Sequence, residues 1–441
     1  MANCKFLRQK KQVKINGEWV DTRSYRYLPY CDGGTPGVRV RGSNPNGEVI
    51  VYLSSEVNGV LSYMGHTIQL DANGNGYLAL KSDDIVAYVA IKNSVPSRGV
   101  AEISGCYASI QGTNKIPPST LKDIDELIVD CARYRRLGNG YFSQSNFEGK
   151  KITIKSLDTS NETDTSHMFT NCYSATSIDV SGLNTSNATD MGAMFGNCHS
   201  VTSLDVSHFN TSNVTEMGQM FTNCESLSFL DVSHFNTSNV TNMGAMFESC
   251  QSLQTLNLSN FNTSNVTDME SMFEYCESLR SLDVSHFNTS NVTNMRYMFR
   301  FCESLQSLDV SKFNTSNVTN MSQLFFACCS LQTLNVSNFN TSNVTDMESM
   351  FDNCQSLQTL NVSNFNMSNV TDISLMFCAC MSLQTLDISG WNLTNASTSS
   401  MFVGCKRLNT IYMRNCSQTT IDKIKDELEY ANILDQVTII T

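Results

Sequence analysis

Seventeen cysteines are the residues of this chain best able to do chemistry, through disulfide bonds, metal ligation or nucleophilic attack. Ten of them keep a fixed spacing, in which nine recur every 26 residues and the tenth follows after 25. Stacked neighbours would lie about 5 Å apart, within reach of a disulfide. Equivalent thiols that all point into one core instead behave as small hydrophobic groups, and we favour this interpretation. The ten are Cys172, Cys198, Cys224, Cys250, Cys276, Cys302, Cys328, Cys354, Cys380 and Cys405.

Metal and catalytic sites have no recognisable residue pattern in this sequence. Cys328-Cys329 and Cys378-Ala-Cys380 lack partner pairs at zinc spacing. His208, His234 and His286 share one repeat position, but no motif pairs them with a nucleophile. A P-loop, HExxH, GxSxG and a Gly-rich dinucleotide fingerprint are missing. We therefore predict no catalytic residues, no metal site and no cofactor.

Acidic and amide side chains alternate at one repeat position, on the outward side of the expected strands. Such a stripe could hold cations or hydroxyl-rich glycans. We favour a solvated face that keeps the protein soluble and prevents lateral pairing. The stripe consists of Asp205, Asp231, Asn257, Asp283, Asp309, Asn335, Asn361 and Asp387.

Residues that differ from the repeat consensus are the best guide to a binding site, because the stacking of one coil on the next does not require them. Most repeats carry Gly, Ala, Ser or Asn where the middle repeats carry charged and aromatic residues. Arginine and aromatic residues on a plain surface are typical of binding hot spots, whereas neutral drift is the alternative. We predict that this aromatic–arginine band contacts a protein partner or a neighbouring subunit. It comprises Glu270, Glu274, Tyr275, Arg296, Tyr297, Arg300, Phe301 and Phe326.

The elements that must position these residues follow from the 26-residue unit, for which 224–250 serves as the example. Leu230 and Val232 alternate with Asp231, as in a short strand whose apolar residues point inward. A polar Asn-Thr-Ser-Asn turn follows. Met243, Met246, Phe247 and Cys250 then lie at i, i+3, i+4 and i+7, which predicts about two turns of helix. Stacked units would bury these faces, so we predict an α/β solenoid of about ten coils.

The unit resembles the BspA-like leucine-rich repeats of bacterial and phage surface proteins, in the variant F-N-T-S-N-V-T-D-M-x-x-M-F-x-x-C. The copies at 261–276 and 339–354 carry this motif, and the resemblance covers about 155–415. It departs from the leucine-rich consensus at Phe235, which occupies the slot of the consensus Asn. The resemblance implies a right-handed rod with its strands on one face and identifies no ligand. The first thirty residues are also similar to the N-termini of structural proteins from Bacteroidales phages.

Four segments make up the expected domain organisation. Residues 1–112 form an antiparallel β domain that anchors the chain, with strands at 48–55, 66–81 and 84–91 and a hairpin turn at 71–76. Residues 113–160 supply a helical N-cap, centred on 119–136, and a degenerate first repeat. Residues 161–405 form the solenoid. Residues 406–441 form a β-α-β cap in which Thr420 is the N-cap of the helix.

Charge is divided unevenly along the chain, whose net charge is −12. Residues 1–155 hold 20 Lys and Arg against 14 Asp and Glu, whereas residues 162–404 hold 4 against 21. So acidic a surface repels phosphate backbones, which argues against nucleic acid as a partner. No stretch approaches the roughly 18 apolar residues of a membrane helix, and a secretory signal peptide is not expected.

These features predict a non-enzymatic structural or adhesive protein. Free thiols in number favour assembly in a reducing bacterial cytoplasm, so we predict a virion component of a phage tail or fibre. A cell-surface or extracellular BspA-like adhesin is the alternative, and an enzyme with its site in the N-terminal domain is a third. The expected partners are other virion or surface proteins at the N-terminal domain, and a host-cell protein or glycan at the solenoid. A homo-oligomer is also compatible with the sequence.

Overall fold

The computed structural model describes residues 149–157, 159 and 162–441, together with the backbone of the strands that lie between Gln12 and Cys131. The chain divides into two compact units. The first comprises 1–188 and 204–210, and the second comprises 189–203 and 211–441. The expected domain boundary near residue 112 stays a prediction.

The first unit begins with antiparallel strands. Strand β1 pairs with β2, β6 pairs with β7, and β3, β4, β5 and β8 form one sheet in that order. Strand β7 pairs with β6 and β8 pairs with β5, and most of the hairpin turn predicted at 71–76 lies outside the described residues. The bounds are β1 Gln12–Ile15, β2 Glu18–Asp21, β3 Tyr25–Leu28, β4 Val38–Arg41, β5 Glu48–Ser54, β6 Val60–Tyr63, β7 His66–Gln69 and β8 Asn75–Lys81.

A second sheet of this unit runs in the order β13-β12-β11-β10-β9. Only the β9–β10 pair is antiparallel, and the other pairs are parallel. The helix predicted at 119–136 is wrong, because its centre is strand β11. A strand between two parallel neighbours carries a nearly continuous apolar run, and such a run also satisfies helical spacing. The bounds are β9 Ala90–Lys92, β10 Val100–Ser104, β11 Glu126–Cys131, β12 Lys151–Leu157 and β13 Ser177–Asp179.

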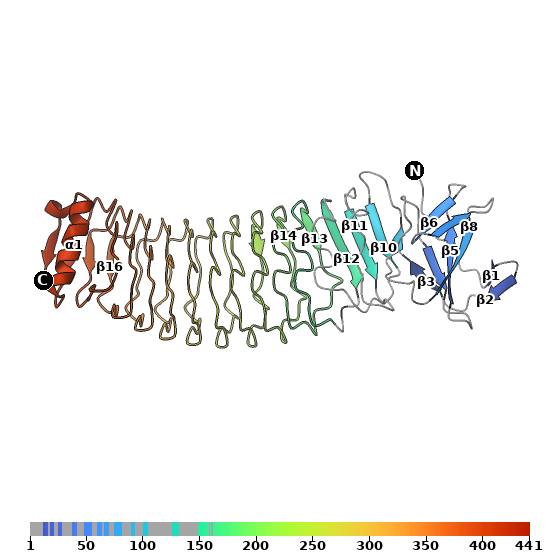
Figure 1. Ribbon diagram of the computed structural model, residues 1–441, viewed down its shortest axis with the longest axis horizontal. Helices are drawn as coiled ribbons and strands as arrows, with labels where there is room; N and C mark the ends of the chain where they lie inside the picture. Colours follow the sequence, from blue (N-terminus) through green and yellow to red (C-terminus); the bar gives the residue numbers. More distant parts are fainter. Residues whose placement is uncertain are drawn as a thin grey trace. The chain divides into compact units, whose positions relative to one another are not determined.

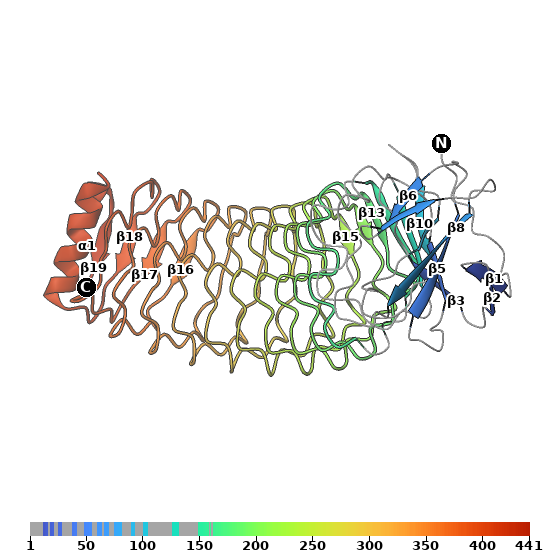
Figure 2. The ribbon, with the colours of Figure 1, turned by 45° about the vertical axis from the view of Figure 1, so that its right-hand side comes forward.

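The second unit is a parallel β-solenoid, whose coils stack one beside the next (Figures 1 and 2). Its regular strands are short, and β16, β17, β18 and β19 form one parallel sheet. Elsewhere single parallel bridges join equivalent residues, such as Thr255 and Ser281. The strands within this unit are β15 Phe229–Leu230, β16 Thr359–Asn361, β17 Thr385–Asp387, β18 Thr410–Tyr412 and β19 Thr438–Ile440, and β14 Ser203–Leu204 lies at its boundary with the first unit.

The predicted helix in each coil is wrong, and the segment is a run of turns. Met243, Ala245, Phe247 and Ser249 donate their backbone N–H groups to the next coil, over 2.6–3.1 Å. Met246, Glu248 and Cys250 instead donate to the carbonyl three residues back, over 3.1–3.2 Å. Ala245 and Ser249 take positive φ values of 53° and 55°. The i, i+3, i+4, i+7 pattern is nevertheless buried, because these turns also point those four side chains inward.

Phenylalanine and threonine ladders fill the core between coils. Rings from Phe195 to Phe402 stack at centroid distances of 5.7–6.0 Å. Each buried threonine of the turn Asn-Thr-Ser-Asn makes two bonds to the next coil. Thr289 Oγ1 donates to the Asn314 carbonyl over 2.9 Å and accepts from the Asn314 N–H over 2.8 Å. Identical residues recur because each must bond the copy beside it.

The ten ladder cysteines are buried free thiols, which confirms that interpretation. From Cys224 to Cys405 each Sγ donates to a phenylalanine carbonyl of the preceding coil, over 2.9–3.4 Å. Burial raises the pKa of Cys224, Cys276 and Cys405 to about 12. Thiols so far from ionisation are inert, so they serve packing.

Helix α1 (Gln418–Tyr430) lies across the end of the stack, and β19 pairs with β18 (Figure 2). Ser417 caps the helix by accepting the Thr420 N–H over 3.2 Å, so the prediction that Thr420 is the N-cap is wrong. Lys423 Nζ donates to the carbonyls of Leu393, Thr394 and Ala396 over 2.8–3.3 Å. A 3-10 turn, η3 (Leu434–Gln436), precedes β19. No helix in the described part of the chain is long and apolar enough to cross a membrane.

We predict that Thr289→Val destabilises the solenoid by about 1–3 kcal/mol, because the Asn314 N–H loses its acceptor, the hydroxyl of the fully buried Thr289 side chain. The measurement is the midpoint of urea denaturation. Thr293→Val is the matched control, since Thr293 is exposed and its hydroxyl makes one bond, to the Thr267 carbonyl over 3.3 Å. Equal effects of the two substitutions would contradict the ladder's role.

Candidate functional site

The structure brings the residues of the aromatic–arginine band together on the turn side of three consecutive coils. Glu270, Glu274 and Tyr275 come from the first of these coils. The second coil supplies Arg296, Tyr297, Arg300 and Phe301, and the third supplies Phe326. Positions 26 residues apart are neighbours across the coils, so departures in successive repeats become one cluster.

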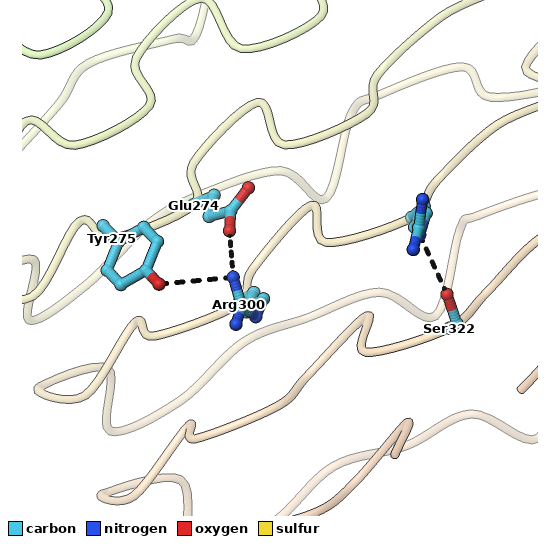
Figure 3. Close-up of polar contacts among 5 residues, drawn as sticks. Glu274, Tyr275, Arg300 and Ser322 are labelled. Atoms are coloured by element: carbon cyan, nitrogen blue, oxygen red, sulfur yellow. Dashed lines mark hydrogen bonds and ion pairs between the residues drawn. The ribbon is translucent and has the colours of Figure 1, made fainter. Parts of the chain in front are cut away.

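Arg300 is the centre of the cluster (Figure 3). Its Nη1 pairs with Glu274 Oε1 over 2.5 Å and lies 3.3 Å from the Tyr275 hydroxyl. The Glu274 side chain is 7% exposed and that of Arg300 is 23% exposed. A carboxylate this buried needs a charged partner, because an unpaired one would lose its hydration without compensation. The ion pair therefore belongs to the protein's own packing.

Four aromatic rings surround the same guanidinium. Its Cζ lies 4.8 Å from the Phe301 ring centre and 5.1–5.4 Å from those of Tyr275, Tyr297 and Phe326. Tyr275 stacks on Phe301 at 4.6 Å, and Phe326 meets Phe301 edge-on at 5.1 Å. Cation–π contacts of this kind hold both the cation and the rings in place. The cluster is thus a preorganised and half-exposed surface.

Arg296 and Glu270 lie at one repeat position, beside this centre. Arg296 Nε donates to Ser322 Oγ over 3.2 Å, and its Cζ lies 4.2 Å from the Tyr297 ring centre. Glu270 Oε2 accepts from Asn294 Nδ2 over 2.9 Å. Both side chains are half-buried. Arg296 is held by a serine hydroxyl and one ring, and its charge opposes the rise that burial causes in the pKa of Glu348. Because its guanidinium is not locked in a buried ion pair as that of Arg300 is, Arg296 is the cation of the band best placed for a partner molecule.

Three aromatic residues of the band have a backbone conformation that bulky residues disfavour. Tyr275, Tyr297 and Phe301 have φ values of 57°, 63° and 58°. Equivalent residues of other coils, such as Ala245 and Ser249, share this conformation, so the coil imposes it. A large side chain there costs of order 1–3 kcal/mol. The aromatic residues must contribute something that offsets this cost.

Carboxylates flank the cluster on both sides along the stack. Burial raises the pKa of Glu248, and the nearby charges of Glu274 and Glu270 add to the effect. Its Oε2 accepts from the Thr222 hydroxyl over 2.9 Å. Burial also raises the pKa of Asp352 to about 6, although hydrogen bonds from Cys378 and Ser349 oppose the shift. The surface beside the band is therefore acidic and partly desolvated.

The other predicted features have structural roles. Asp231 Oδ1 accepts the Ser233 N–H over 2.9 Å, and all eight residues of the acidic stripe make this same turn bond. His208 and His286 contact backbone carbonyls through Nε2 and pack edge-on against the following phenylalanine. Over the described residues, no group of three His, Cys, Asp or Glu side chains could hold a metal ion.

Two residues of the strand surface were missed by the sequence analysis. Phe229 is 62% exposed at a position that Ser203, Thr255 and Ser281 hold in other coils. Arg280 is exposed at the position of Gln254 and Gln306. The band was found by looking for residues that differ from the repeat at the turn positions. The same search at the strand positions would have found both Phe229 and Arg280. They mark a second surface.

We predict that Arg300→Met lowers the free energy of unfolding by about 2 kcal/mol or more, because it leaves Glu274 buried and unpaired. Adding Glu274→Gln to Arg300→Met should restore part of the loss. Chemical denaturation of the wild type, both single variants and the double variant measures the coupling between the two positions. Additive effects would contradict a structural ion pair.

Asp352 should make stability depend on pH. Its folded pKa of about 6 lies above its ordinary value of 3.8, so its contribution is greatest at low pH and is lost as the pH rises through about 6. Asp352→Asn should therefore raise the denaturation midpoint at pH 7.5 more than at pH 4.5. Asp309→Asn is the control, since hydrogen bonds from Ser311 lower the pKa of that exposed carboxyl. A pH-independent effect of Asp352→Asn would refute the assignment.

Comparison with solved structures and with curated proteins names no ligand. A leucine-rich repeat protein from Bacteroides ovatus ATCC 8483 is 14% identical, over 80% of this chain and 97% of that chain, with a TM-score of 0.21. No curated protein matches the chain.

A family model gives the clearest match. The model described as "Mycoplasma protein of unknown function, DUF285" matches residues 138–255, 224–309 and 301–416. These three overlapping matches span the solenoid coils and more than half of the sequence. The prediction of a repeat family is thereby confirmed, whereas a phage origin stays a prediction. The chain belongs to the DUF285 family.

Proposed function

We propose that the protein is a non-enzymatic structural or adhesive component, in which the solenoid carries binding surfaces at fixed spacing. The observation that carries this proposal is the bonding between coils. Backbone groups, threonine hydroxyls and thiols all bond to the neighbouring coil, so the solenoid is held rigid along its length. Side chains that point outward are not needed for these bonds, so their residue types can vary. The band and the strand surface lie among these outward side chains.

The strand surface supports contact with a target outside the assembly. Phe229 is a large apolar side chain that is 62% exposed, so a partner that covered it would gain the free energy of its burial. Arg280 lies on the same side, two coils further along. An exposed aromatic residue and an arginine on a polar face fit a host-cell protein or glycan.

Placement in a phage virion, as part of a tail or fibre, fits the inert thiols and the acidic solenoid best. A bacterial cell-surface adhesin uses the same binding chemistry and is the second placement. In both placements the N-terminal region would dock to other proteins of the assembly. Finding the chain in purified virions, and not in the envelope fraction of uninfected cells, would favour the first.

The test of adhesion uses variants that the repeat itself supplies. Phe229→Ser and Arg280→Gln install residues that equivalent coils already carry, so the fold should be unchanged. We expect the full-length wild type to bind cells of a responsive gut bacterium, and the double variant to bind about tenfold or more weakly. Thr255→Ser, at the Phe229 position of the next coil, is the control. Equal binding by all three proteins would refute the strand surface as the target-facing side.

A further inference from the structure

Glutamine recurs at one outward position on the strand side of four consecutive coils. In the coils with a regular strand this position directly precedes it, as Gln358 precedes β16. All four side chains are exposed. We call them the amide row, which consists of Gln306, Gln332, Gln358 and Gln384.

Stacking of the coils does not require these glutamines. Within the described residues none of the four side chains makes a hydrogen bond. Equivalent coils carry Thr202, Ser228 and Arg280 at the same position, so other residues fit there. Recent copying of one coil does not explain the row either, because the residue three positions earlier differs in every coil. These earlier residues are Glu303, Cys329, Gln355 and Met381.

The amides are regularly spaced, because equivalent residues of neighbouring coils lie in register. Gln384 donates its backbone N–H to the Gln358 carbonyl over 2.8 Å. Thr359 and Thr385, the residues that follow, pair in the parallel sheet of β16 and β17 (Figure 2). Parallel strands lie about 4.8 Å apart, so the row presents one amide at each such step along the solenoid.

Hydroxyl groups and further amides extend the row across each coil. A serine or threonine follows each glutamine directly, and an Asn or Asp comes two residues later. The two middle coils carry Asn335 and Asn361 there, whereas Asp309 and Asp387 lie in the flanking coils. The centre of this surface is therefore uncharged, and each end of it is acidic.

This composition disfavours two classes of partner. Protein interfaces have an apolar core, but the three outward positions described above carry no apolar residue in any of the four coils. Polymers of phosphate or carboxylate groups would be repelled by Asp309, Asp387 and the net negative charge of the solenoid. An amide both donates and accepts hydrogen bonds, and so does a hydroxyl group. A surface of uncharged amides and hydroxyls matches a ligand rich in hydroxyl groups.

We propose that the amide row binds a neutral polysaccharide that lies along the solenoid and contacts successive coils through its hydroxyl groups. One hydrogen bond to an exposed amide contributes little net free energy, because water makes the same bond. A ligand that repeats along its own length gains the same contact again at each coil, and the linked contacts reinforce one another.

This inference rests on the proposed function and deepens it. The strand surface was assigned a host-cell protein or glycan, and the amide row selects the glycan. Arg280 holds the row's position in the coil directly before Gln306, so the row continues the strand surface toward the C-terminal cap.

Retardation of the full-length chain in native gels that contain a soluble polysaccharide tests the proposal. The neutral probes are mannan, galactomannan and mixed-linkage β-glucan, and polygalacturonate is the anionic probe. We expect at least one neutral probe to slow the wild type, and polygalacturonate to leave its mobility unchanged. Lack of retardation by all three neutral probes, or equal retardation by polygalacturonate, would overturn the proposal.

Variants that the repeat supplies test the row itself. Gln332→Ser with Gln358→Ser installs the residue that Ser228 provides at the same position, so the denaturation midpoint should not change. The dissociation constant for the retarding polysaccharide should rise about fivefold or more, because two amides are lost. Gln323→Ala is the matched control, since it removes an amide from the turn side and installs the residue that Ala245 provides there. Equal binding by the double variant and the wild type would refute the row.

Adhesion to cells and binding to the polysaccharide can fail separately. Phe229→Ser with Arg280→Gln removes the two residues on which adhesion was proposed to depend, but it leaves the amide row intact. This variant should therefore still be retarded by the polysaccharide, even where it no longer binds cells. Loss of retardation in this variant would place the polysaccharide at Phe229 and Arg280 and contradict the row.

Discussion

Donation of alternate backbone N–H groups from one coil to the next is the interaction on which the solenoid depends. A turn at 243–250 has no acceptors of its own for Met243, Ala245, Phe247 and Ser249. Only a neighbour with the same backbone path presents carbonyls at the right places. That requirement explains positive φ at non-glycine residues, the recurrence of buried threonine, and the thiol at each turn's end. Unpaired backbone groups are costly when buried, so each coil is stable only beside another.

Prediction from the sequence succeeded where burial decides and failed where hydrogen bonding decides. Met243, Met246, Phe247 and Cys250 were correctly placed inward, but their spacing cannot distinguish an α-helix from turns that bond to the next coil. Strand β11 shows the converse, since it pairs with parallel neighbours on both sides, and its sequence is a nearly continuous apolar run without the alternation that identifies a strand. The band was found because its residues break the repeat. Its internal pairing of Arg300 with Glu274 could not be foreseen, because that depends on side-chain geometry across two coils.

Arginine is scarce in this solenoid, and the two arginines of the band differ in role. Arg300 neutralises a buried carboxylate and holds four rings, so its loss would damage the fold before it revealed anything about binding. Arg296 is tied to its surroundings by a serine hydroxyl and one ring. An alanine scan that treated the band as a uniform hot spot would confuse the two. Residues that break a repeat are therefore candidates for support as well as for recognition.

Lys423 and Glu427 of helix α1 satisfy the free hydrogen-bonding groups of the last coil. The lysine ammonium occupies carbonyls that a further coil would have bonded, and the Glu427 carboxylate accepts the Thr398 hydroxyl and the Met401 N–H. The ladder before them has the same bonds at every step. Removing or duplicating 26 residues in the middle of the solenoid would place equivalent coils next to each other. The contacts of helix α1 with the last coil would not change. Thirteen residues at 261–273 recur unchanged at 339–351, as expected of a gene that has lengthened by copying whole coils. The length of the solenoid can thus change in evolution without a change in how each coil folds or in which surface binds a partner.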